Sequence, residues 1–213
     1  SYQLSSSVNL SAAFALGKYI FASDPNLAIN FDTSGNEEDF ISIEGTKDLG
    51  IAEIKNYKLP TGPQTALSLG VEYRDPKYWW VSAKINYLSD NYASISTIRR
   101  TQSFYLNPDT AQPFDNATPD NVDRILKQNP LDVIYLLNLV GGKSWLLNGK
   151  YLSVFASINN VFDTDFRTGG YEQNRNGNYG QLVKDNLSGS PSFGPKYWFG
   201  YGRTYFLNLA ISF

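Results

Sequence analysis

The last stretch of the chain alternates strictly between two kinds of side chain. From Tyr205 to Phe213 every second residue is apolar, whereas the positions between them are mostly small or polar. A period of two is typical of a β-strand with one apolar face. The strand ends on an aromatic residue, as the closing strand of an outer-membrane barrel does at the membrane interface. A core strand of a soluble β-sandwich would alternate in the same way, so this stretch alone leaves both structures open.

The same period recurs along the chain and predicts about six strands. The expected ranges are 8–21, 67–73, 79–87, 133–145, 152–159 and 202–213. Residues 74–77 and the pair Asn148-Gly149 are predicted tight turns. The connections therefore alternate long, short, long, short, long, which is the plan of an up-and-down barrel. Inside the second long segment, Thr118 and Pro119 predict the start of a short helix.

The alternation also predicts which side chains share a face. The expected lipid-facing set is Val8, Leu10, Phe14, Leu67, Leu69, Val71, Val81, Ile85, Leu137, Leu139, Val154, Ile158, Leu207, Leu209 and Ile211. Aromatic residues gather at the strand ends, as in the two girdles of a membrane barrel. The predicted interface aromatics are Tyr73, Tyr78, Trp79, Trp145, Tyr151, Trp198 and Phe213. On the opposite face, Glu72 and Lys84 are expected to form an ion pair.

Composition excludes several classes of function. The chain has no run of 18 apolar residues, so no transmembrane helix is expected. It contains 0 His and 0 Cys, which excludes His-based catalysis, thiolate sites and the common zinc sites, and we expect no enzyme and no cofactor. A net charge of -2 without a basic stripe argues against nucleic-acid binding. Asp109, Asp115, Asp120 and Asp123 match no calcium loop, so we expect no metal there.

These observations predict an all-β fold, namely an antiparallel up-and-down transmembrane β-barrel segment with long outer loops and short periplasmic turns. Six strands do not close, because the smallest barrels of this type have about eight. The remaining strands are expected from the same polypeptide or from further copies of it. The chain begins at Ser1, with neither Met nor a signal peptide, and we expect it to be a fragment or a processed piece of the C-terminal part of the barrel.

Several motifs resemble one family. Asn159-Asn160-Val161-Phe162-Asp163 is similar to the N-x-F-D pattern in the penultimate strand of TonB-dependent outer-membrane receptors, and Gly202 to Phe213 resembles their closing strand. The resemblance to the SusC-like receptors of the Bacteroidetes is stronger. Residues 63–80, residues 86–92 and Arg99-Arg100-Thr101 resemble the late-barrel region of these receptors. The similarity covers essentially the whole chain, with the motifs in the family's order.

This resemblance implies active import across the outer membrane. The family has a barrel of about 22 strands with an N-terminal plug. It imports large, scarce nutrients such as iron chelates, glycans or peptides with energy that TonB delivers. The plug and the TonB box lie outside this chain. The implied partners are the bilayer, the rest of the barrel, the plug, TonB and, as in many SusC-like receptors, a SusD-like lipoprotein.

Ligands of such receptors meet the outer loops, where Arg and aromatic side chains can hold sugars, carboxylates or chelates. The candidate residues are Arg99, Arg100, Phe104, Tyr105, Arg167, Tyr171, Asn174, Arg175 and Tyr179. For any one of them, packing of the loops against one another is the more frequent role. Two other functions stay open at this point, a soluble carbohydrate-binding β-sandwich and a passive or structural pore assembled from several copies.

Overall fold

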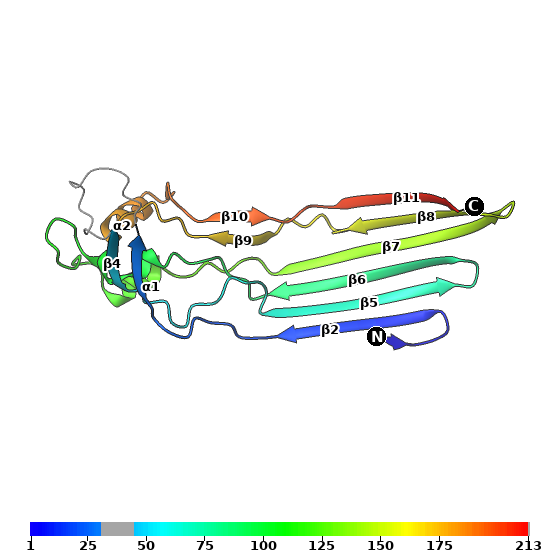
Figure 1. Cartoon of the computed structure of the whole chain (residues 1–213), viewed down its shortest axis with the longest axis horizontal. Helices are drawn as coiled ribbons and strands as arrows, with labels where there is room; N and C mark the ends of the chain where they lie inside the picture. The colour runs from blue at the N-terminus through cyan, green and yellow to red at the C-terminus, as the bar shows by residue number, and fades with distance from the viewer. Residues whose placement is uncertain (31–44, 213) are drawn as a thin grey trace.

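The computed structural model describes residues 1–30 and 45–212, and one antiparallel sheet of seven strands dominates it (Figure 1). The strands, in their order across the sheet, are β1 (Tyr2–Gln3), β2 (Val8–Leu16), β5 (Thr65–Asp75), β6 (Trp79–Ser89), β7 (Ile134–Leu147), β8 (Lys150–Asn159) and β11 (Thr204–Ser212). Apart from the two-residue β1, these are the six strands that the alternation predicted. The all-β class and the antiparallel order are confirmed. The sheet is open, since no pairing within the described residues joins β11 to β1 or β2.

Several predicted strand ends differ from those in the structure, and two of the differences have local reasons. The first strand ends at Leu16 and does not continue to residue 21, because its partner β5 begins opposite it at Thr65, just after Pro63. At the other end, β5 continues through Asp75, so the turn predicted at 74–77 lies at 76–78, where Tyr78 has a φ of 61°. The Asn148-Gly149 hairpin is confirmed, with φ values of 50° and 80° that match a type I′ turn.

The connections divide the molecule into two ends. In Figure 1 the hairpins β5–β6 and β7–β8 lie at one end of the elongated sheet. The described parts of the three long segments, namely residues 17–30 with 45–64, residues 90–133 and residues 160–203, extend to the other end, where they pack together; we call this region the head. The head and its approaches contain β3 (Asn26–Asn30), β4 (Thr46–Ile51), η1 (Ile98–Arg100), η2 (Gln102–Tyr105), α1 (Pro119–Ile125), β9 (Arg167–Tyr171), α2 (Tyr179–Leu187) and β10 (Lys196–Phe199).

One of the two α-helices follows from the sequence signals. In α1, Thr118 caps the helix by accepting a hydrogen bond from the Asn121 amide at 3.4 Å, and Pro119 is the first helical residue, as predicted. The helix α2 was not predicted, because Gly, Asn and Ser surround it. Its apolar residues Tyr179, Leu182 and Val183 nevertheless have helical spacing. Among the described residues, no helix is long and apolar enough to span a membrane.

The large sheet has one predominantly apolar face, on which the register also places Asp75 and Lys143, both in line with Trp79 at the hairpin end. The strand register places all fifteen predicted residues on that face, for example through the pairs Leu69↔Ile85 and Val154↔Leu209. No second layer covers it in the described part of the chain, and Leu209 is 66% exposed. The buried hydrophobic side chains lie instead in the head or at its border with the sheet. They are Leu49, Ala52, Ile54, Ala93, Ile95, Phe104, Leu126, Leu131, Ile134, Tyr179 and Leu182.

The opposite face is richer in Ser, Asn and Gly but also carries a row of rings. Trp80 and Phe155 have ring centroids 6.1 Å apart, and Phe155 and Phe206 lie at 5.9 Å. A Cβ atom at Gly142 would come within 3.0 Å of the Trp80 indole nitrogen, so this glycine makes space for the ring.

The predicted ion pair between Glu72 and Lys84 is wrong. Glu72 lies opposite Ser82 and Lys84 lies opposite Gly70, so the two charged residues are offset by two positions across the strands. Glu72 instead forms an ion pair with Arg74, two residues along its own strand on the same face.

The predicted interface aromatics occupy several environments. Tyr73, Trp79 and Trp145 lie on the apolar face at the hairpin end, with 5.1 Å between the Tyr73 and Trp79 ring centroids. Tyr78 lies in the β5–β6 turn. Tyr151 pairs with Leu146 and therefore lies on the opposite face, contrary to its expected role.

The remaining two aromatics of that set are Trp198 and Phe213. Trp198 is on β10, which pairs with β9 outside the large sheet, and Phe213 lies outside the described residues. At the head end of the apolar face, Tyr87 and Tyr135 have ring centroids 5.1 Å apart. This second aromatic pair gives the apolar face rings at both of its ends.

Candidate functional site

The three long segments share hydrophobic contacts in the head. In one cluster, Phe104 and Leu126 from the second segment pack with Tyr179 and Leu182 from the third. In another, Ala52 and Ile54 from the first segment pack with Ile95 from the second, and Phe21 and Tyr57 pack against them. The head therefore has a hydrophobic core to which all three segments contribute.

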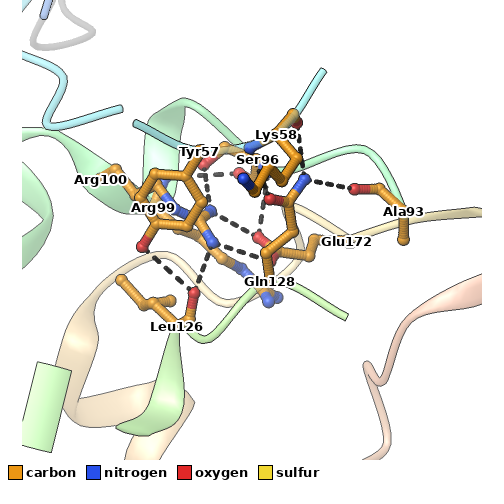
Figure 2. A network of polar contacts seen from close by, with 9 residues as sticks. All are labelled: Tyr57, Lys58, Ala93, Ser96, Arg99, Arg100, Leu126, Gln128 and Glu172. Atoms are coloured by element: carbon orange, nitrogen blue, oxygen red, sulfur yellow. Dashed lines mark hydrogen bonds and ion pairs between the residues drawn. The ribbon is translucent and has the colours of Figure 1, made fainter. Parts of the chain in front are cut away.

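Arg100 lies at the point where the three segments meet (Figure 2). Its Nη1 donates to Glu172 Oε2 at 2.6 Å and its Nη2 donates to Glu172 Oε1 at 2.8 Å, which is a bidentate ion pair. The same two nitrogens also donate to the carbonyl oxygens of Ser96 and Leu126, at 2.9 and 2.7 Å. The Tyr57 ring from the first segment lies 4.5 Å from the guanidinium carbon.

Burial makes this ion pair sensitive to the loss of either partner. The side chains of Arg100 and Glu172 are 1% and 7% exposed. Burial alone disfavours the charged guanidinium, but the hydrogen bonds and charge of Glu172 outweigh that effect and raise the pKa of Arg100 above its ordinary value. We call the Arg100–Glu172 pair the clasp, since it joins the second and third segments.

Gln128 provides a second link between the segments. Its Nε2 donates to the carbonyl oxygens of Lys58 and Ala93, at 2.8 and 3.0 Å, and its Oε1 accepts from the Lys58 amide at 2.8 Å. A backbone bridge between Ala52 and Thr101 joins the first and second segments as well. These bonds satisfy buried backbone groups that no regular strand pairing serves.

A pocket of about 380 Å³ lies beside the clasp. Its walls come from the second and third segments and include Arg99, Arg124, Lys127, Glu172, Leu182 and Phe193. Three of its lining residues are cationic and one is acidic, so the pocket has an excess of positive charge. The volume falls in the range of sites for small molecules.

Arg99 is the lining residue with unsatisfied polar atoms. The residue is 5% exposed, and its Nε and Nη2 atoms are buried with no hydrogen-bond partner in the described chain. Burial lowers the pKa of Arg99, the charge of Glu172 raises it, and the neighbouring Arg100 lowers it. A guanidinium nevertheless stays protonated in proteins, so this pocket wall carries a buried positive charge.

The other predicted ligand residues have different environments. Arg100, Phe104 and Tyr179 are buried in the head, and the half-buried Tyr105 packs against the same core. Phe104 also lines a second pocket of about 410 Å³. Asn174 and Arg175 are exposed on the third segment, outside the lining of the pocket.

Arg167 and Tyr171 lie on β9, in the β9–β10 pair. The Nε and Nη2 atoms of Arg167 donate to the Asp132 carboxylate at 2.9 and 2.6 Å, and its guanidinium carbon lies 4.7 Å from the Tyr197 ring. Tyr171 lies against Trp198, with ring centroids 5.6 Å apart. Arg167 therefore links β9 to Asp132 and to β10, and Tyr171 links β9 to β10.

We expect replacement of Arg167 by Gln to raise the pKa of Asp132. The Arg167 hydrogen bond holds the pKa of that carboxyl below its ordinary value, which is about 3.9 in an unfolded chain. Because the folded-state pKa is the lower one, the pair stabilises the folded state above about pH 4, and this contribution is lost as the pH falls through the folded-state pKa. A ¹³C NMR titration of the carboxyl measures the change. Arg175→Gln is the matched control, and an equal Asp132 pKa in both variants would contradict the assignment.

The N-x-F-D motif joins three strands at the head end of the sheet. The Asn160 amide donates to Asn138 Oδ1 at 2.9 Å, next to β8, while its side chain bonds the backbone of Thr164 in both directions, at 2.9 and 3.0 Å. Asp163 accepts from the Arg203 amide at 2.6 Å, just before β11. The motif therefore fixes where the third long segment leaves and re-enters the sheet.

Sequence reasoning missed most of the pocket. Glu172 carried no signal of its own, because its partner Arg100 lies 72 residues away. The helical spacing on α2 would have placed Leu182 in a core. Residues 1–30 and 45–212 contain no group of three or more acidic side chains placed to hold a metal ion.

Comparison of the chain with protein-family models, curated proteins and solved structures finds no match to any of them. A functional assignment therefore rests on the fold, on the head and on the motifs of the sequence.

Proposed function

We propose that this chain forms part of an outer-membrane β-barrel, and that the barrel is an active importer of the TonB-dependent, SusC-like kind. The uncovered apolar face of the large sheet carries this proposal. A sheet in water needs a second layer over such a face, as in a sandwich. A sheet in a bilayer needs none, because the hydrocarbon chains cover it.

The dimensions of the sheet support the same proposal. Its long strands have 9 to 14 residues, and a bilayer requires about 9 to 11 per tilted strand. The long connections gather at one end and the hairpins at the other, as in barrels with long outer loops and short periplasmic turns. The open edges at β11 and β1 would pair with further strands of the barrel.

The importer role rests on the motifs that resemble the family. In that role the head would lie outside the membrane and meet the cargo, which is a large nutrient such as an iron chelate, glycan or peptide. The plug and TonB would act through parts of the polypeptide outside this chain, and a SusD-like lipoprotein would cover the head. The carbohydrate-binding sandwich gains no support from an uncovered sheet, and a passive pore made of several copies is the remaining alternative.

Spin labels on adjacent residues test the membrane face. The chain has 0 Cys, so Leu209→Cys and Asn208→Cys each give a single labelling site, on opposite faces of β11. In outer-membrane vesicles, we expect oxygen to relax the label at residue 209 more strongly, whereas a water-soluble nickel chelate relaxes the label at 208. Equal access of the nickel chelate to both labels would overturn the membrane proposal.

The intact mass of the polypeptide separates the importer from the passive pore. An importer of about 22 strands with a plug would give a mass about four to five times the 23.9 kDa of this chain. A polypeptide near 23.9 kDa in the outer-membrane fraction would instead indicate a barrel assembled from copies.

A further inference from the structure

We infer that the pocket beside the clasp binds a small organic anion, with its carboxylate or phosphate group on the Arg99 guanidinium and an apolar body against Leu182 and Phe193. The inference concerns the head alone, so it goes beyond the import proposal and does not depend on where the sheet lies. It rests on the contrast between two adjacent arginines.

Arg99 and Arg100 differ in how their charges are compensated. The Nη atoms of Arg100 donate four hydrogen bonds, two of them to Glu172, while its Nε has no partner in the described chain. Glu172 is occupied by these bonds and by the Ser96 amide at 3.0 Å. None of these bonds comes from Arg99, whose Nε and Nη2 atoms have no partner in the described chain.

An unpaired buried charge is costly, so folded proteins pair such groups with an opposite charge. Asp185 is a further carboxylate whose charge acts on Arg99, but its hydrogen bonds go to other groups. Asp185 accepts from the Ser192 and Phe193 amides, at 2.9 and 3.2 Å, and from the Asn176 side chain. Within residues 1–30 and 45–212, no carboxylate forms a hydrogen bond with the Nε or Nη2 atom of Arg99, and on this inference a bound anion does so.

The pocket itself indicates the class of that molecule. Arg99 lies on its wall together with Arg124 and Lys127, and the one acidic lining residue is the occupied Glu172. Phe193, Leu182 and Pro191 provide an apolar part of the wall. A planar guanidinium matches a carboxylate or phosphate in bidentate geometry. A volume of about 380 Å³ fits a small organic anion better than a bare inorganic ion.

The binding of matched small molecules tests this inference on the full chain in detergent micelles. Benzoate and phenyl phosphate are the anionic probes, and benzamide is the neutral probe of the same shape. We expect saturable binding of at least one anion by calorimetry, with benzamide at least about tenfold weaker, as the loss of a charge-assisted hydrogen bond predicts.

Two variants make the result decisive. Arg99→Gln is expected to weaken anion binding about tenfold or more and to leave benzamide binding unchanged, whereas Arg175→Gln removes an exposed charge from the same head and should change neither. The Arg99 variant should fold at least as stably as the parent, because it loses an unpaired buried charge. Equal binding of anion and benzamide, an undiminished affinity in Arg99→Gln, or no saturable anion binding at about 10 mM would overturn the inference.

Discussion

Replacing Glu172 by Gln is expected to lower the stability of the head by about 3–5 kcal/mol, which is typical when one partner of a buried ion pair is removed. The reason is that Arg100 is 1% exposed at its side chain and would stay charged without a carboxylate. Its remaining acceptors would all be uncharged, namely the carbonyl oxygens of Ser96 and Leu126 and the amide oxygen that the substitution leaves at position 172. Hydrogen exchange at the core amides of Phe104 and Leu182 measures the change in opening free energy.

The Arg167–Asp132 pair provides the matched control. It is also bidentate, but its side chains are 26% and 41% exposed, so water compensates for the loss of one partner. We expect Asp132→Asn to change stability by about 0–1 kcal/mol. The double variant Arg100→Met with Glu172→Leu should recover much of the loss, because it removes both buried charges. If Glu172→Gln and Asp132→Asn had equal effects, the clasp would not hold the head together.

Replacing Leu209 by Arg is expected to destabilise the assembled barrel by about 2–4 kcal/mol. Leu209 lies in the middle of β11, opposite Val154 in the middle of β8, which is where a spanning strand crosses the centre of the bilayer. An Arg side chain there would enter hydrocarbon, whereas near an interface it could reach water. Resistance of the folded form to heat in gel electrophoresis, together with denaturant titration in lipid vesicles, measures the loss.

Asn208→Arg is the control for this substitution. The residue is adjacent to Leu209 on the same strand but faces away from the apolar side, so the new charge would lie on the lumen side of the proposed barrel. We expect a change of less than about 1 kcal/mol there. If the two variants behaved alike, the assignment of the two faces would be wrong.

Local sequence patterns predicted most of the sheet. Alternation identified every long strand, and the hairpin at Asn148-Gly149 and the cap at Thr118 followed from residues next to one another in sequence. Predictions failed where the partner of a side chain depends on how two strands pair. Glu72 found Arg74 on its own strand instead of Lys84, because the register between β5 and β6 offsets the two charged residues by two positions.

The candidate site was predicted less well than the sheet. The sequence indicated that Arg and aromatic residues of the long segments matter, but it could not rank them. Phe104 and Tyr179 became core residues, whereas Arg99 came to line a pocket, and nothing in their immediate neighbourhoods separates these outcomes. Burial of a loop residue depends on which other segment covers it, and that segment is far away in the chain.

The sequence by itself determined which side chains of the sheet share a face, because a strand's period of two is a local property of the backbone. It also determined the alternation of short and long connections. Only the tertiary structure decided that the long segments close into a head around the clasp. It also decided that Arg100, and not Arg99, receives Glu172, a choice set by packing between residues 72 positions apart.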